Sequence, residues 1–124
     1  ATNEIYTLSL HDALPILRKE GLTLGSGAVI VLGPGRDPAD TIRSILEFFR
    51  HESCGKCVPC RVGTARLAEA GRGLAAAKPG DRRGILDAMV EEARRMAATS
   101  LCPLGQSPIL PLASAARELR EALS

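Results

Sequence analysis

The sequence predicts a mainly α-helical fold: a small four-helix bundle preceded by a short N-terminal strand. Three observations predict it. From residue 38 onward, apolar residues recur at intervals of three and four, as they do on the buried face of a helix. Proline and glycine interrupt this pattern mainly at short connections. The 124-residue chain has no Trp, two Phe and one Tyr, so its core must come from the Leu, Ile and Ala side chains that pack between helices.

The first segment, Ala1 to Ile16, has neither helical nor strand periodicity. It lacks the basic start of a signal peptide, and Asp12 and Pro15 interrupt its apolar stretch. Residues 4–16 read EIYTLSLHDALPI, which resembles the conceptual translation of a common sequencing adapter. We therefore interpret residues 1–16 as a non-native leader and assign no function to His11 or Asp12.

A short strand is expected from Leu24 to Leu32, where the apolar run LGSGAVIVL contains β-branched residues between glycines. The turn Gly33-Pro34-Gly35 ends it. The glycines of Gly25-Ser26-Gly27 and of this turn complete neither a dinucleotide-binding fingerprint nor a phosphate-binding loop. We interpret both groups as turns.

The first helix is expected from Pro38 to Arg50, with Asp37 or Asp40 as its cap. Its apolar face carries Ile42, Ile45, Leu46 and Phe49.

Three further helices complete the predicted bundle. The second runs from about Arg61 to Ala77 and is stopped by Lys78-Pro79-Gly80. Asp81 caps the third, and the Cys102-Pro103 turn leads into the fourth. Their inward residues are Ala65, Leu67, Ala70 and Leu74, then Ile85, Met89, Ala93 and Met96, then Leu112, Ala116, Leu119 and Leu123. The solvent face of the third helix is expected to carry Arg82, Arg83, Arg94 and Arg95.

The chain has four cysteines, and three of them form the run Cys54, Cys57 and Cys60. The fourth, Cys102, lies far downstream and directly precedes a proline. A Cys-x-x-Cys-x-x-Cys run with a remote Cys-Pro is typical of 4Fe–4S proteins, because the closely spaced thiolates can surround one face of a cluster and the remote one completes the ligand set. This spacing predicts a 4Fe–4S cluster at one end of the bundle, held by the first and third connections between helices.

A zinc site is the main alternative, in which the four thiolates would staple a helical interaction domain without a redox role. Structural zinc sites usually present two separate Cys-x-x-Cys pairs, whereas the second pair is missing around Cys102. Disulfides are disfavoured, since the three clustered cysteines are too close to pair usefully and one distant partner cannot serve three.

Several residues near the cysteines can support such a site. Gly55 lets the backbone bend toward a cluster, and Lys56 and Arg61 bring positive charge beside an anionic one. For these two cations, plain surface positions are an equally good interpretation. His51 is better explained as a helix-end residue that interacts with the helix dipole than as a cluster neighbour.

Composition excludes several function classes. A formal net charge of +2 is too small to indicate nucleic-acid binding, and no apolar run is long enough for direct membrane insertion. Reduced cysteines without a signal peptide favour a cytoplasmic location, which includes the cytoplasmic face of a membrane complex.

Two motifs carry a family resemblance. Glu52 to Thr64, ESCGKCVPCRVGT, together with Ser100 to Gly105, SLCPLG, resembles the C-terminal cluster domain of the NADH-binding flavoprotein subunit of respiratory complex I. Similar domains occur in diaphorase subunits of NAD(P)-linked hydrogenases and in β subunits of NAD-dependent formate dehydrogenases. The match covers roughly Leu17 to Ser124.

The resemblance implies that Cys54, Cys57, Cys60 and Cys102 ligate the cluster, which takes electrons from reduced FMN and passes them to a partner subunit of a multi-subunit dehydrogenase or hydrogenase. FMN and NAD(P) would bind only to upstream parts that have no counterpart here, so the chain is not expected to be catalytic alone. We accordingly expect residues 17–37 to be a strand and linker remnant of an upstream domain, and residues 38–124 to form the helical 4Fe–4S domain.

Overall fold

The computed structural model describes residues 15–17, 19 and 31–118. The chain divides into two units, residues 1–31 and 32–124. In the first unit, residues 15–17 and 19 are helical, although their sequence has no helical periodicity. Most of the predicted strand, Leu24 to Leu32, lies outside the described residues; its last two residues, Val31 and Leu32, have no regular secondary structure. The predicted domain boundaries after residues 16 and 37 stay predictions.

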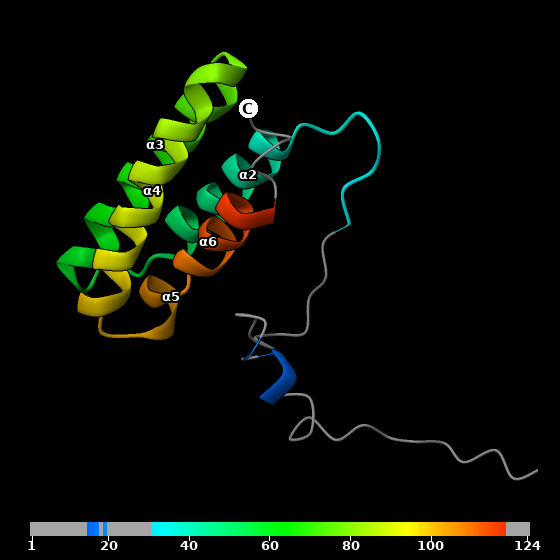
Figure 1. The fold of residues 1–124 in the computed structure, drawn as a ribbon. Helices are drawn as coiled ribbons and strands as arrows, with labels where there is room; N and C mark the ends of the chain where they lie inside the picture. Colours follow the sequence, from blue (N-terminus) through cyan, green and yellow to red (C-terminus); the bar gives the residue numbers. More distant parts are fainter. Residues whose placement is uncertain (1–14, 18, 20–30, 119–124) are drawn as a thin grey trace, which may run out of the picture. The chain divides into compact units, whose positions relative to one another are not determined.

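The second unit is helical, which confirms the mainly α fold (Figure 1). Between residues 31 and 118 the structure contains five helices: α2 (Pro38–Glu52), α3 (Val58–Ala76), α4 (Pro79–Thr99), the single turn α5 (Pro103–Gln106) and α6 (Ile109–Glu118). Helix α3 packs between α2 and α4, and α4 also contacts α5 and α6. Figure 1 shows the turn between α3 and α4 at one end of the bundle and α5 at the other.

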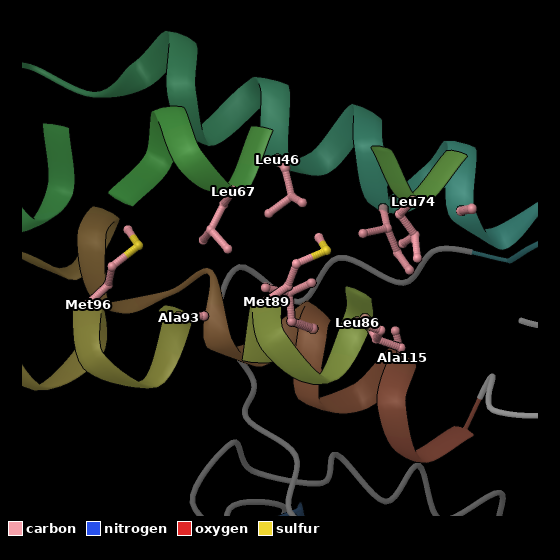
Figure 2. Close-up of a cluster of buried hydrophobic side chains, with 11 residues drawn as sticks. Leu46, Leu67, Leu74, Leu86, Met89, Ala93, Met96 and Ala115 are labelled. Carbon is pink, nitrogen blue, oxygen red and sulfur yellow. The ribbon is translucent and has the colours of Figure 1, made fainter. Parts of the chain in front are cut away.

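The core lies where these helices face one another (Figure 2). Leu46 of α2, Leu67 of α3, Met89 of α4 and Leu112 of α6 are each at most 2% exposed. Burying such side chains is the main favourable contribution to folding. Met89 and Met96, at 2% exposure each, are core residues as predicted.

Two predicted helix boundaries are wrong for a common reason, the position-dependent effect of proline. The second helix ends within one residue of the predicted end, since α3 ends at Ala76 with Ala77 as its C-cap, but Pro79 opens α4 with Lys78 as the N-cap in place of Asp81. Proline suits the first turn of a helix, where its missing N–H needs no partner. Similarly, Pro108 separates α5 from α6, so the predicted fourth helix is two helices.

Arg82 departs from its predicted place on the solvent face of the third helix. Its side chain is only 12% exposed and makes a two-pronged ion pair with Asp37, with Nη1–Oδ1 and Nη2–Oδ2 distances of 3.1 and 2.8 Å. The Arg82 Nε–H also donates to the Ala77 carbonyl. Asp37 caps α2 by accepting from the Ala39 N–H at 2.9 Å, as predicted. One carboxylate therefore joins the start of α2 to the start of α4.

Candidate functional site

All four cysteines lie at the end of the bundle where α2 passes into α3 and α4 passes into α5. Cys54 and Cys57 belong to the α2–α3 connection, Cys60 to the first turn of α3, and Cys102 is the N-cap of α5. Their exposure differs: Cys54 is exposed, Cys57 and Cys102 are partly buried, and Cys60 is buried at 3%. This is the position predicted from the sequence, at the first and third connections between the predicted helices.

The α2–α3 connection has a bent backbone that is braced by α3. Gly55 has a φ of +75°, a left-handed conformation that glycine adopts without the strain of a side chain. The Arg61 guanidinium donates to the Gly55 carbonyl at 3.1 Å. Arg61 is therefore more than a solvated surface residue, because it ties the loop between Cys54 and Cys57 to the first turn of α3.

Cys57 is the cysteine with the clearest link to the distant motif. The backbone N–H groups of Leu101 and Cys60 favour the Cys57 thiolate and hold the pKa of the Cys57 thiol below its ordinary value. Amide donors favour a thiolate because they stabilise its negative charge. Since Leu101 directly precedes Cys102, this contact brings the downstream Cys-Pro segment against the three-cysteine run.

Cys60 lies deepest and is surrounded by small residues. The Thr64 hydroxyl donates to its carbonyl at 2.7 Å, and the Ser53 Oγ lies 3.4 Å from its Sγ. A Cβ added to Gly105 of α5 would lie 3.0 Å from the Cys60 Cβ. Only a residue without a side chain allows α5 to approach Cys60 this closely.

The segment between α4 and α5 is held by hydrogen bonds at Ser100. Its N–H donates to the Met96 carbonyl at 2.9 Å, and its own carbonyl accepts from the Gln106 Nε2 at 2.9 Å. The Ser100 Oγ, by contrast, is buried without a hydrogen-bond partner in the part of the chain that the structure describes. Sequence reasoning did not single out Ser100; its position two residues before Cys102 was the available signal.

The remaining neighbours do not line the site. The His51 side chain is 86% exposed, lies in the last turn of α2 and pairs with Glu52, as expected of a helix-end residue. Lys56 is exposed on the same connection as Cys54 and Cys57. Because Lys56 lies between Cys54 and Cys57 in the sequence, its positive charge stays close to these cysteines.

Four cysteine thiols are the ligands that a 4Fe–4S cluster uses. The four cysteines lie at one end of the bundle, with backbone amides beside Cys57 and the Ser53 hydroxyl beside Cys60. Across residues 15–17, 19 and 31–118, no three Cys, His, Asp or Glu side chains are grouped closely enough to hold a single metal ion. A cubane cluster places its four irons at separate corners, so its ligands approach different atoms and need not meet at one point.

The chain matches a known family and several curated proteins. Residues 40–124 match the family described as the NADH-ubiquinone oxidoreductase-F iron–sulfur binding region. The chain is 33% identical over 106 residues to the mitochondrial NADH dehydrogenase [ubiquinone] flavoprotein 1 of Dictyostelium discoideum. It is 29% identical over 104 residues to the F subunits of NADH-quinone oxidoreductase from Rickettsia bellii and Rhizobium meliloti.

These alignments cover 84% of this chain but only 21–24% of each relative. The chain therefore spans about a quarter of their length or less. The matches confirm the predicted family resemblance, and they confirm the 4Fe–4S cluster as the cofactor. They replace the zinc interpretation, because the matching family is described by iron–sulfur binding. None of the described helices is both long and apolar enough to cross a membrane.

Proposed function

We propose that this chain is a one-electron relay of a larger flavoprotein. The basis is that the chain belongs to the family of NADH-ubiquinone oxidoreductase-F iron–sulfur binding regions. In this proposal it takes electrons from reduced FMN and delivers them to another subunit of a multi-subunit dehydrogenase or hydrogenase. The observation that supports it most is the close approach of α5 to Cys60, where a Cβ on Gly105 would lie 3.0 Å from the Cys60 Cβ, because it brings the two cysteine motifs together at one end of the bundle.

In this proposal Cys54, Cys57, Cys60 and Cys102 are the four ligands. The first three come from one loop and the helical turn after it, so the local backbone sets their relative positions. Cys102 is held by the packing of α5 against α3 and α4. When bound, a 4Fe–4S cluster supplies one-electron oxidation and reduction.

The surface beside the cysteines supports transfer to a partner protein. Leu101, between Ser100 and Cys102, is 79% exposed, and Val58, directly after Cys57, is 60% exposed. Apolar side chains exposed next to a redox site can pack against a partner and exclude water from the contact. An electron can then leave near the protein surface without passing through the core of the bundle.

The NADH and FMN sites belong, in this proposal, to the portion of the relatives that this chain does not span. NADH delivers two electrons as a hydride, whereas a 4Fe–4S centre exchanges one, so a flavin must stand between them. The glycine-containing turn at Gly33-Pro34-Gly35 lacks the pattern of a nucleotide site.

Anaerobic reconstitution of the full chain tests the ligand assignment. Iron and sulfide analysis should give a 4Fe–4S stoichiometry, and the Cys102→Ala variant should lose the cluster or convert it to a smaller one. Ser107→Ala is a matched control, since it changes a side chain in the same segment whose hydroxyl donates to the Pro103 carbonyl. Full iron content and an unchanged EPR spectrum in Cys102→Ala would refute the assignment of Cys102.

A further inference from the structure

Ser100 is a buried polar residue whose hydroxyl has no hydrogen-bond partner among the described residues. The residue is 7% exposed, and its Oγ has no hydrogen-bond partner within the part of the chain that the structure describes. A buried hydroxyl without a partner is unfavourable, so such a group in a folded protein calls for an explanation. Its backbone N–H and C=O are both occupied, by Met96 and Gln106. The backbone of Ser100 is thus held in place, and its hydroxyl remains available to a ligand.

The hydroxyl lies at the cysteine site. A Cβ placed on Gly105 would be 2.5 Å from the Ser100 Oγ and 3.0 Å from the Cys60 Cβ, so both atoms surround the same point. Ser100 also lies two residues before Cys102 in the chain. The unsatisfied donor is therefore close to one proposed ligand in space and to another in sequence.

We propose that the Ser100 hydroxyl donates a hydrogen bond to a sulfur atom of the bound cluster or its thiolates, and so raises the reduction potential. The inference rests on the proposed function, because it needs a cluster at the four cysteines. A hydrogen bond to sulfur stabilises the reduced state more than the oxidised one, since the reduced cluster carries more negative charge. Ser100 is a tuning residue here and not a ligand.

Ser53 offers a second donor of the same kind. Its Oγ is 3.4 Å from the Cys60 Sγ. When Cys60 is a thiolate, its sulfur has no proton to give, so the hydroxyl must be the donor. Ser53 and Ser100 come from different connections of the bundle, one before α3 and one after α4. Their effects on the potential should accordingly be separable.

The test is a potentiometric titration of the anaerobically reconstituted full chain, followed by EPR. At a fixed potential, Ser100→Ala should lower the ratio of reduced to oxidised cluster about tenfold, which corresponds to a shift of about 59 mV to more negative potential. Ser53→Ala should shift in the same direction. Ser107→Ala should leave the potential unchanged, because the Ser107 hydroxyl is already bonded to the Pro103 carbonyl at 2.7 Å.

A second measurement distinguishes a hydrogen bond from a structural effect. ENDOR spectra of the reduced protein in H2O and D2O should show an exchangeable proton coupled to the cluster that disappears in Ser100→Ala and stays in Ser107→Ala. Ser100→Gly, which also removes the contact with Gly105, is a second variant without the hydroxyl. Wild-type potential and an unchanged proton coupling in both Ser100 variants would overturn the inference while leaving the relay intact. A wild-type chain that takes up no cluster would overturn both.

Discussion

Substituting Gly105 by alanine should loosen the cysteine site from within, because α5 has no room for a methyl group. The added Cβ would lie 2.5 Å from the Ser100 Oγ, 2.6 Å from the Ser100 Cβ and 3.0 Å from the Cys60 Cβ. Two of these atoms are Cβ atoms fixed directly to backbone, so no rotamer change can move them away. The strain must be relieved by moving α5, and with it Cys102, away from Cys60.

The magnitude follows from two opposing effects. Overpacking a tight contact costs roughly 1–3 kcal/mol, while replacing glycine by alanine inside a helix gains up to about 1 kcal/mol. The net expectation is a loss of about 1–2 kcal/mol. For a domain of this size, that lowers the melting temperature by about 4–8 °C for each kcal/mol. Because Cys102 moves with α5, Gly105→Ala should also lose iron faster than the wild type during incubation with a chelator.

Gly73→Ala is the matched control. Gly73 is an exposed position in α3, and a Cβ there would meet nothing within 4 Å. This substitution should stabilise the protein by about 0.5–1 kcal/mol through helix propensity alone. Thermal unfolding of the reconstituted variants, followed by circular dichroism, measures the difference. If Gly105→Ala proves as stable as Gly73→Ala and retains iron equally well, the steric argument is refuted.

A double-mutant cycle separates the contributions of the two neighbours. In a Ser100→Gly background the serine contacts are gone, and only the 3.0 Å approach to Cys60 remains. Gly105→Ala should then cost less, with a coupling energy of roughly 0.5–3 kcal/mol between the two sites. Simple additivity of the two substitutions would show that Ser100 is not what opposes the methyl group.

Three other predictions concern the bundle and its chemistry. Asp37→Asn keeps an N-cap side chain but breaks the ion pair with Arg82, so it should cost about 1.5–3 kcal/mol in urea denaturation at neutral pH. The Ala39 N–H and then Arg82 hold the Asp37 pKa below its ordinary value of 3.8. The stability that the charged carboxylate gives is present above that value and is lost as the pH falls through the lower folded-state pKa. The difference in unfolding free energy between wild type and Asp37→Asn should therefore decrease in that pH range. Leu67→Ala should cost about 2–5 kcal/mol, because Leu67 is 1% exposed in the core. NADH should not bleach the reconstituted chain even with added FMN, whereas dithionite should; saturable reduction by NADH would contradict the proposal that the NADH site lies outside this chain.

Periodicity predicted most of the helical core because burial imposes it, although Ala65, which was expected to face inward, is exposed. The apolar faces of the first three expected helices contain Leu46, Leu67 and Met89, which are all buried. The start of α4 was predicted less well, because Pro79, interpreted as part of the stop of the preceding helix, lies in the first turn of α4. The ion pair between Arg82 and Asp37 was not predicted either, because it joins residues far apart in the sequence that local pattern cannot relate.

The candidate site, like the helices, was predicted only in part from the sequence. The Cys-x-x-Cys-x-x-Cys run, the remote Cys-Pro and the family resemblance predicted the four candidate ligands, since all three can be read from the sequence. It could not reveal that Ser100, Gly105 and Cys60 share one small space, because that contact forms only when α5 packs against α3. Polar residues that reach the site only after the helices pack, such as Ser100, can therefore be identified from the structure but not from motif spacing.

The packing of α3 against α4 also sets how the two cysteine motifs meet. Helix α3 carries Cys60 in its first turn and Leu67 in the core, while Met96 near the end of α4 leads directly to Ser100 and the Cys102 segment. A Cβ on Gly63 of α3 would collide with the Met96 side chain, so the two helices are in close contact just beside the site. A cluster bound to both motifs would cross-link them, and by linkage its binding free energy would stabilise the bundle. Substitutions that separate α3 from α4 at this contact should therefore weaken cluster retention and folding together, even though they touch no cysteine.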